Sequence, residues 1–356
     1  MTPYLLVLFA VSLLAAAGRA SRSLATRRLS LWLVAVILAA FAGLRERSVG
    51  LDTGNYVYEF SVATSSAHIV RSTEVGFNLL VFAARSISDS YAAILLLIAM
   101  IVVGCYMWTI TRLAVRVDWA IYLLVTLGVY TFFFNGARQG LAAAICFAAL
   151  PALIHRKAIL YVVMVAIAAT FHHSAVVALP MYVLASRRFT LNRLLLLGAA
   201  GIAAIALLQP IIQLAGDFIS DRYYVYAQPG EGGGGEVFLA YLVVQGAALL
   251  VFRERVQARY AEVYLLLLNL YLVGLIPALA SVFSGVNPSG LFRLHMYFSP
   301  VAILMWPMLF ASAETARNKV AVNYLATALT LVFFVLTTMA FSDLVPYRVN
   351  PDLFQW

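Results

Sequence analysis

Thirteen apolar segments follow one another along the chain, and short polar stretches separate most of them. A helix needs about 20 apolar residues, or at least about 17, to cross the hydrocarbon core of a bilayer. The segments lie at 3–17, 29–44, 74–88, 90–111, 119–134, 136–154, 158–171, 174–186, 194–214, 237–252, 261–283, 293–311 and 321–341. This series predicts an all-α polytopic membrane protein.

The composition excludes the soluble classes. Apolar residues make up 64% of the chain and charged residues 11%, whereas soluble domains have about 45–50% and about 25%. The mean hydropathy is +0.94. A water-soluble globular protein, a disordered chain and a secreted disulfide scaffold are therefore excluded. Cys105 and Cys146 both lie within apolar runs, which favours two buried thiols over a disulfide. No Cys/His cluster has the spacing of a zinc site.

The basic residues predict the orientation in the membrane. Of 24 basic residues, 16 lie in six short loops, at 19–28, 112–118, 155–157, 187–193, 253–259 and 317–319. Cytoplasmic loops carry such clusters, so the net charge of +9 indicates membrane orientation and not nucleic-acid binding. The first apolar segment has its charges after it, whereas a secretory signal has them before it. We therefore expect a retained first helix with its N-terminus outside the cytoplasm.

One interval contains an odd number of segments. Three apolar segments lie between loops 19–28 and 112–118, and three crossings cannot return the chain to the same side. The weakest, 74–88, covers about 15 residues between Glu74 and Arg85. We predict that it lies at the outer interface or is re-entrant. About 12 transmembrane helices (11–14) then remain in a single integral membrane domain, with both termini outside and outer loops at 45–73 and 215–236.

The segments 158–171 and 174–186 are both short. Each helix would be about 20 Å long, less than the hydrocarbon thickness of about 30 Å. They form either a short hairpin, with His172 and His173 at a recessed outer tip, or one long helix. We favour the hairpin, because a single helix would place the arginines of loop 187–193 outside.

Two arginines on the predicted outer side are candidates for anion binding. Arg138 lies between two apolar helices without an acidic neighbour in sequence, and an ionised group there is costly unless it is paired or hydrated. Arg293 begins the segment 293–311. A guanidinium binds phosphate oxygens in a bidentate manner, so both arginines in one cavity would suit a pyrophosphate. The alternatives are an Arg138 that extends to lipid head groups and an Arg293 paired with a carboxylate.

The outer side also carries candidate bases. Adjacent histidines cannot face the same direction, so either His172 or His173 is suited to act as a base near neutral pH, and the other is structural. Asp52, Glu59 and Glu74 are suited to deprotonate a sugar hydroxyl or to pair with the arginines. In its glycine-flanked turn, Asp52 is alternatively a turn residue. The glycine-rich run 229–236 lacks the Lys-Ser/Thr ending of a phosphate-binding loop and is interpreted as a flexible linker.

The order of these motifs resembles the EpsG family of Wzy-like exopolysaccharide and O-antigen polymerases. The resemblance covers nearly the whole chain and rests on Asp52 with Tyr56, Glu74-Val75-Gly76-Phe77, Ala137-Arg138-Gln139, Phe171-His172-His173-Ser174, Arg293 with Tyr297-Phe298, and Pro346-Tyr347.

The resemblance implies a polysaccharide polymerase with an architecture similar to GT-C glycosyltransferases. Its substrates would be undecaprenyl-pyrophosphate-linked oligosaccharides, joined at the periplasmic face of the bacterial cytoplasmic membrane without a nucleotide sugar, metal or other cofactor. His172, or alternatively Asp52 or Glu74, would be the base, and Arg138 and Arg293 would bind the pyrophosphate. Other substrate contacts are expected from Tyr56, His173 and Tyr297. A chain-length regulator and a flippase of the same pathway would be partners.

Two other functions fit parts of the pattern. A transporter, such as a flippase for the same lipid-linked unit, would have many crossings and proline-broken helices. Transporters often contain two related halves with polar residues near the midplane, whereas here no halves are visible and the unusual polar residues gather on one side. A membrane acyltransferase that decorates glycans would need a catalytic histidine, but its usual flanking motifs are missing.

Overall fold

The computed structural model describes residues 1–356 apart from 64–73, 186–187, 189, 219–234, 284–287, 313–315 and 355–356. In this described part, nine helices are long and apolar enough to cross a membrane: Thr2–Ala20, Leu24–Gly43, Ala92–Leu113, Val117–Asn135, Ala137–Ile154, Gly235–Arg255, Ala258–Phe283, Phe292–Ser312 and Asn323–Ala340. Shorter apolar helices lie at Val75–Ile87, Ala158–Phe171, His173–Leu184 and Leu195–Leu207. Every predicted apolar segment thus carries helix. The helical multi-pass architecture is confirmed, and the count of twelve crossings stays a prediction.

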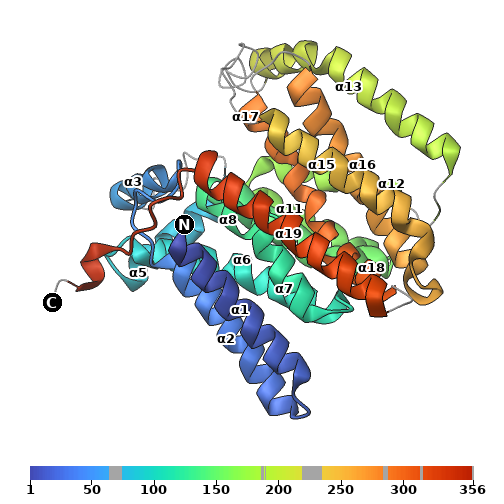
Figure 1. The fold of residues 1–356 in the computed structure, drawn as a ribbon. Helices are drawn as coiled ribbons and strands as arrows, with labels where there is room; N and C mark the ends of the chain where they lie inside the picture. Colours follow the sequence, from blue (N-terminus) through green and yellow to red (C-terminus); the bar gives the residue numbers. More distant parts are fainter. Residues whose placement is uncertain are drawn as a thin grey trace. The chain divides into compact units, whose positions relative to one another are not determined.

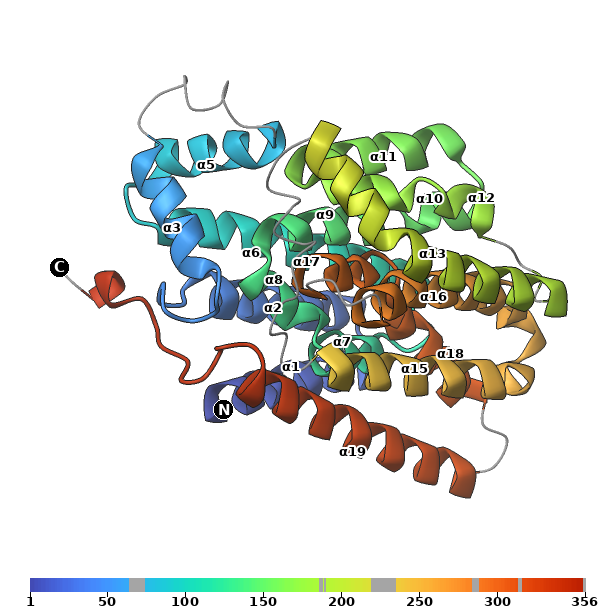
Figure 2. The ribbon, with the colours of Figure 1, turned by 90° about the horizontal axis from the view of Figure 1, so that it is seen from above.

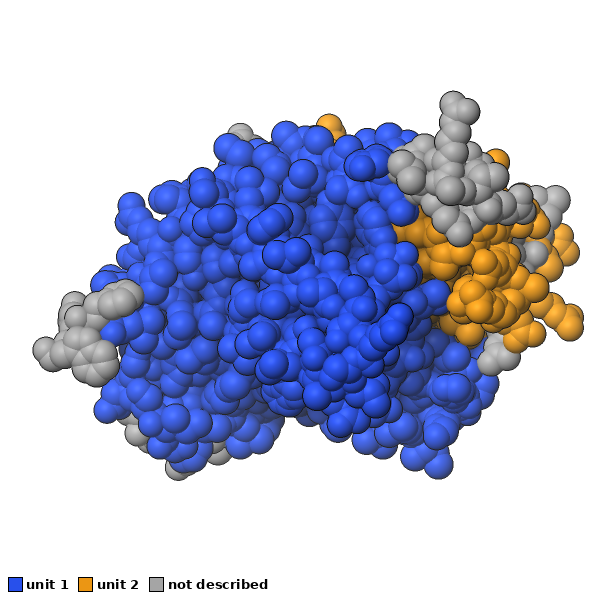
Figure 3. Space-filling view, turned by 60° about the horizontal axis from the view of Figure 1, so that its bottom comes forward, with its two compact units in different colours: residues 1–179, 313–356 blue, residues 180–312 orange. Residues whose placement is uncertain are grey.

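The chain divides into two compact units (Figure 3). Unit 1 comprises Met1–Leu179 and Ala313–Trp356. Its helices are α1 (Thr2–Ala20), α2 (Leu24–Gly43), α3 (Thr53–Val62), α5 (Val75–Ile87), α6 (Ala92–Leu113), α7 (Val117–Thr126), α8 (Val129–Asn135), α9 (Ala137–Ala148), α10 (Leu150–Ile154), α11 (Ala158–Phe171), η1 (His173–Ala178), α19 (Ala316–Ala340) and η6 (Pro351–Phe354).

Unit 2 comprises Pro180–Ser312. Its helices are α12 (Met181–Leu184), α13 (Leu191–Phe218), α15 (Gly235–Val251), η3 (Phe252–Arg255), α16 (Ala258–Phe283), α17 (Pro288–Leu291), η4 (Phe292–Tyr297), η5 (Ser299–Val301) and α18 (Ala302–Ser312). Most of the predicted glycine-rich outer loop lies outside the described residues. The prediction of a single integral membrane domain stays a prediction.

Helix α9 is the central helix of unit 1. It packs against α6 on one side and α11 on the other (Figure 2). The span that it begins, Ala137–Ile154, is 89% buried, whereas the α2 span is 22% buried. Small residues allow helices to approach closely within a membrane, and α9 presents a run of alanines at 142–144. The central position of α9 fixes the place of Arg138 in its first turn.

The C-terminal segment pairs with the loop after α2. The N–H of Glu46 donates to the carbonyl of Arg348 at 2.9 Å, and the N–H of Asn350 donates to Leu44 at 2.9 Å. The hydroxyl of Tyr347 donates to the carbonyl of Phe41 at 2.7 Å. This segment, α3 and α5 lie at one end of unit 1 (Figure 1), so the end of the chain helps to fix the predicted outer loop.

A buried arginine fixes the same loop. Arg45 is 0% exposed, and its guanidinium donates to the carbonyl of Ala42 and lies 4.4 Å from the centre of the Phe134 ring. Its Nε and Nη2 atoms lie 3.4 and 3.3 Å from the hydroxyl of Thr53, the first residue of α3. Burial lowers the pKa of Arg45 to about 10, which leaves the side chain charged at neutral pH.

An ion pair joins two of the predicted cytoplasmic loops. Arg19 lies 3.7 Å from the carboxylate of Asp118, so loops 19–28 and 112–118 meet at the same end of unit 1. An even number of crossings must therefore separate them, as the prediction of an interfacial segment at 74–88 requires. The structure has helix α5 on that segment, and its place at the membrane interface stays a prediction.

The hairpin interpretation of the histidine segment is confirmed. The hydroxyl of Tyr161 donates to the carbonyl of Ala178 at 2.7 Å. In one continuous helix these residues would be about 25 Å apart. The chain instead leaves α11 at His172, which has an extended backbone with φ −157° and ψ 120°. It returns along α11 as η1.

Candidate active site

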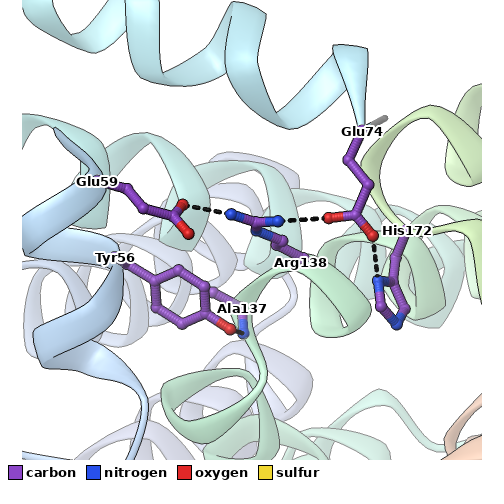
Figure 4. A network of polar contacts seen from close by, with 6 residues as sticks. All are labelled: Tyr56, Glu59, Glu74, Ala137, Arg138 and His172. Atoms are coloured by element: carbon purple, nitrogen blue, oxygen red, sulfur yellow. Dashed lines mark hydrogen bonds and ion pairs between the residues drawn. The ribbon is translucent and has the colours of Figure 1, made fainter. Parts of the chain in front are cut away.

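Four side chains from four segments form one hydrogen-bonded network. The guanidinium of Arg138 donates from Nη1 to Glu74 Oε2 at 2.7 Å and from Nη2 to Glu59 Oε2. The second oxygen of Glu74 lies 2.6 Å from His172 Nδ1. Figure 4 shows the resulting order, which runs Glu59, Arg138, Glu74 and His172. The network joins α3, the start of α5, the start of α9 and the end of α11.

Aromatic residues hold Arg138 in place. The hydroxyl of Tyr56 accepts the N–H of Ala137 at 3.0 Å and so ties α3 to the first turn of α9. The guanidinium of Arg138 lies 4.6 Å from the centre of the Phe77 ring, within range of a cation–π interaction. These contacts fix both the backbone and the guanidinium of Arg138.

A glycine allows α5 to approach α11. A Cβ atom on Gly76 would lie 2.3 Å from the hydroxyl oxygen of Thr170. This is closer than two non-bonded atoms can approach, so a residue with a side chain does not fit here. Gly76 lies two residues after Glu74, and Thr170 lies two residues before His172. The close approach at Gly76 therefore brings Glu74 to His172, which explains the role of the glycine in the segment Glu74-Val75-Gly76-Phe77.

The two carboxylates differ in burial. The Glu74 side chain is 4% exposed, whereas that of Glu59 is 37% exposed. Burial raises the pKa of Glu74, but interactions with His172 and Arg138 outweigh this effect and lower the pKa from 4.5 to about 2. Glu74 is therefore ionised at any physiological pH.

The charge of Glu74 determines which ring nitrogen of His172 carries the hydrogen. An ionised carboxylate only accepts hydrogen bonds, so His172 Nδ1 carries the hydrogen and donates it. In neutral His172, the lone pair is then on Nε2. The side chain is 33% exposed. The arrangement is that of a base oriented by a carboxylate, which recurs in serine proteases and other hydrolases.

Arg138 is paired with two carboxylates. The sequence shows no acidic residue beside it, whereas its partners Glu74 and Glu59 are 64 and 79 residues away. The pairing explains how an arginine is kept at the start of a buried helix, because carboxylates offset the cost of burying a cation. The predicted role of Arg138 in pyrophosphate binding stays a prediction.

Comparison with known proteins assigns the family. The model of the EpsG family matches residues 28–349. The chain belongs to the EpsG family. This confirms the resemblance seen in the sequence, and the family is one of Wzy-like polymerases. No curated protein and no solved structure matches the chain, so the GT-C-like architecture stays a prediction. All four network residues of this EpsG chain lie within the matched range.

The structure distinguishes the two adjacent histidines of the EpsG chain. His172 belongs to the network, whereas His173 begins η1, is exposed, and its imidazole makes no hydrogen bond to the residues that the structure describes. Asp52 immediately precedes α3, seven residues before Glu59, and is not one of the residues joined in Figure 4. The roles predicted for His173 and Asp52 stay predictions.

Arg293 and Tyr297 of the EpsG chain lie in η4 of unit 2, and Tyr297 is 6% exposed. Tyr56, Arg138 and His172 belong to unit 1. The prediction that Arg293 shares one pyrophosphate site with Arg138 stays a prediction.

Glu59 was not among the catalytic and substrate-binding residues predicted for the EpsG chain. It was one of three outer-loop carboxylates considered either as a base or as a partner of the arginines, and the structure shows it in the second of these arrangements. A signal was present, because Glu59 follows Tyr56 by three residues and side chains with this spacing share one face of a helix. Tyr56 was already a candidate, and the face that carries it also carries Glu59.

Proposed function

We propose that this EpsG-family protein joins undecaprenyl-pyrophosphate-linked oligosaccharide repeat units by glycosyl transfer at the periplasmic face of the cytoplasmic membrane. Family membership supports a Wzy-like polymerase in general. The observation that carries the finer proposal is the network of Figure 4, in which a cation suited to a pyrophosphate lies next to a base suited to a sugar hydroxyl.

In the proposed reaction, one lipid-linked chain donates its reducing-end sugar to a hydroxyl group of a second lipid-linked unit. A new bond forms between the acceptor oxygen and the anomeric carbon. The bond between that carbon and the pyrophosphate oxygen breaks, and the lipid pyrophosphate leaves with the electron pair. The hydroxyl proton passes to the base.

His172 is the best candidate for this base. Its Nε2 carries the lone pair, because Nδ1 donates to Glu74. Glu74 itself is a weak base, since its pKa is lowered to about 2. We propose that Glu74 orients the imidazole and stabilises the imidazolium that forms. Asp52 remains the alternative base.

Arg138 and Arg293 are proposed to bind the pyrophosphate. Fixed positive groups act most strongly where negative charge grows during the reaction, here on the leaving pyrophosphate. Arg138 lies in the first turn of α9, and the partial positive charge of a helix N-terminus also favours anions. Tyr56, His173 and Tyr297 are proposed to contact other parts of the substrate.

The proposed reaction uses lipid-linked units as both donor and acceptor and needs no nucleotide sugar. A reconstitution without nucleotide sugar therefore tests the proposal. We expect the purified protein, reconstituted in lipid vesicles with undecaprenyl-pyrophosphate-linked repeat units, to form a ladder of longer lipid-linked glycans. The ladder should form without any nucleotide sugar or added metal, and gel electrophoresis would measure it. Unchanged single units after incubation with folded protein would contradict the proposal.

A further inference from the structure

One edge of the Arg138 guanidinium is only half occupied. Nε and Nη2 lie on the same edge of a guanidinium, and this edge can bind two oxygens of one anion. Glu59 accepts from Nη2 through one oxygen. Nε is buried and has no hydrogen-bond partner among the residues that the structure describes. A buried donor without a partner is costly, so this edge is suited to an anion that fills both positions.

A second arginine of unit 1 shows the fully occupied arrangement. Arg116 donates from Nε to one oxygen of Asp118 at 3.0 Å and from Nη2 to the other oxygen at 2.7 Å. Both positions of its edge are filled by a single carboxylate. The contact between Arg138 and Glu59 lacks the Nε half of this arrangement.

The two carboxylates on Arg138 are held unequally. Glu74 is 4% exposed and binds both Arg138 and His172. Glu59 is 37% exposed, and among the described residues its carboxylate forms a hydrogen bond and ion pair with Arg138 alone. Glu59 can therefore turn towards solvent at a small cost, whereas Glu74 would lose two charge-assisted hydrogen bonds.

The balance of charge also favours displacement of Glu59. Two ionised carboxylates outweigh the single guanidinium, so a pyrophosphate would meet a net negative charge while Glu59 is in place. The carboxylate of Glu59 and a pyrophosphate bound to the same guanidinium would repel each other. If Glu59 turns away, Arg138 can bind two phosphate oxygens through Nε and Nη2 while Nη1 stays on Glu74.

We propose that Glu59 is an exchangeable carboxylate, which covers the pyrophosphate-binding edge of Arg138 and is displaced when a lipid pyrophosphate binds. The proposal rests on the proposed function and names the edge of Arg138 that the substrate uses. When the product pyrophosphate is to be released, Glu59 competes for the same edge and favours its departure. Glu59 is thus a binding-site residue that lowers affinity in order to allow turnover.

Direct binding of tritiated undecaprenyl pyrophosphate to the full-length protein in nanodiscs tests this proposal. Glu59→Gln keeps the shape of the side chain but removes the competing charge. We expect its dissociation constant to be about two- to fivefold lower than that of the wild type, the range for loss of one partly exposed charge contact. Most of this change should appear as slower dissociation.

Three controls accompany the measurement. Glu46→Gln removes a carboxylate that lies 3.9 Å from Arg348 and is not a member of the network, so this variant should bind like the wild type. Arg138→Ala should lose binding. Undecaprenol, which has no phosphate, should not compete with the labelled ligand. Thermal unfolding of each variant shows whether it is folded.

The outcomes separate the two proposals. Tighter binding by Glu59→Gln, with unchanged Glu46→Gln, would support the exchange. Equal or weaker binding by folded Glu59→Gln, while the wild type binds, would overturn the exchange and leave the polymerase proposal standing. Failure of the folded wild type to bind the lipid pyrophosphate would overturn both.

Discussion

Arg138→Ala is expected to abolish polymer formation while the protein stays in the membrane at its normal level. The substitution removes the cation proposed to stabilise the leaving pyrophosphate, and the loss of one such group lowers a rate by about 10²–10³-fold. It also leaves Glu74, which is 4% exposed, without its arginine. Gel analysis of extracted glycan measures the polymer, and immunoblotting of the membrane fraction measures the level of the protein.

Arg85→Ala is the matched control. Arg85 lies in the last turn of α5 and is 28% exposed; it pairs with the exposed Asp89 at 3.7 Å and lies 5.1 Å from the centre of the Phe60 ring, and it is not part of the network. Its loss should leave polymer length unchanged. Arg138→Lys should restore little activity, because an ammonium group cannot bridge two carboxylates as a planar guanidinium does. Polymer of wild-type length in Arg138→Ala would disprove the assigned role.

His172→Ala is expected to lose polymer, whereas His173→Ala, which removes a proposed substrate contact but not the base, should form a reduced amount of polymer. A positioned general base contributes about 10²–10⁴-fold to a rate, and only His172 is oriented by Glu74 at 2.6 Å. The two variants differ by one position in the chain and remove the same imidazole, so each controls for the other. The amount of polymer per membrane-localised protein is the measure.

Glu74→Gln tests how His172 is oriented. An amide keeps the size of the side chain but does not stabilise an imidazolium, so activity should fall below the wild type and remain above His172→Ala. Loss of polymer in His173→Ala with normal polymer in His172→Ala would exchange the roles of the two histidines. Normal polymer in both would exclude a histidine base and favour Asp52.

The helices were predictable from the sequence because membrane spans depend on local properties. Hydrophobic length predicts each span, and charge clusters indicate which loops share a side. The hairpin predicted for segments 158–171 and 174–186 followed from length and charge alone, and the bond between Tyr161 and Ala178 confirms that the chain turns back after α11. Helix boundaries differ from the predicted ones by a few residues.

The network was only partly predictable. Arg138, Glu74 and His172 were each unusual enough to be noticed. Their mutual contacts span 64 and 98 positions, and they depend on the close packing of α5 against α11 at Gly76. Local sequence patterns contain no information on such contacts. Glu59 was not chosen, since a carboxylate in a polar loop resembles any solvated charge.

A strain that lacks the protein provides the most direct test of the central claim. Its lipid-linked glycans would be extracted, their lengths determined by mass spectrometry, and the membrane face that displays them identified with an impermeant label. A polymerase working at the periplasmic face predicts single repeat units on the outer face and no polymer. Units confined to the inner face would show a flippase, and polymer of normal length would likewise contradict the account.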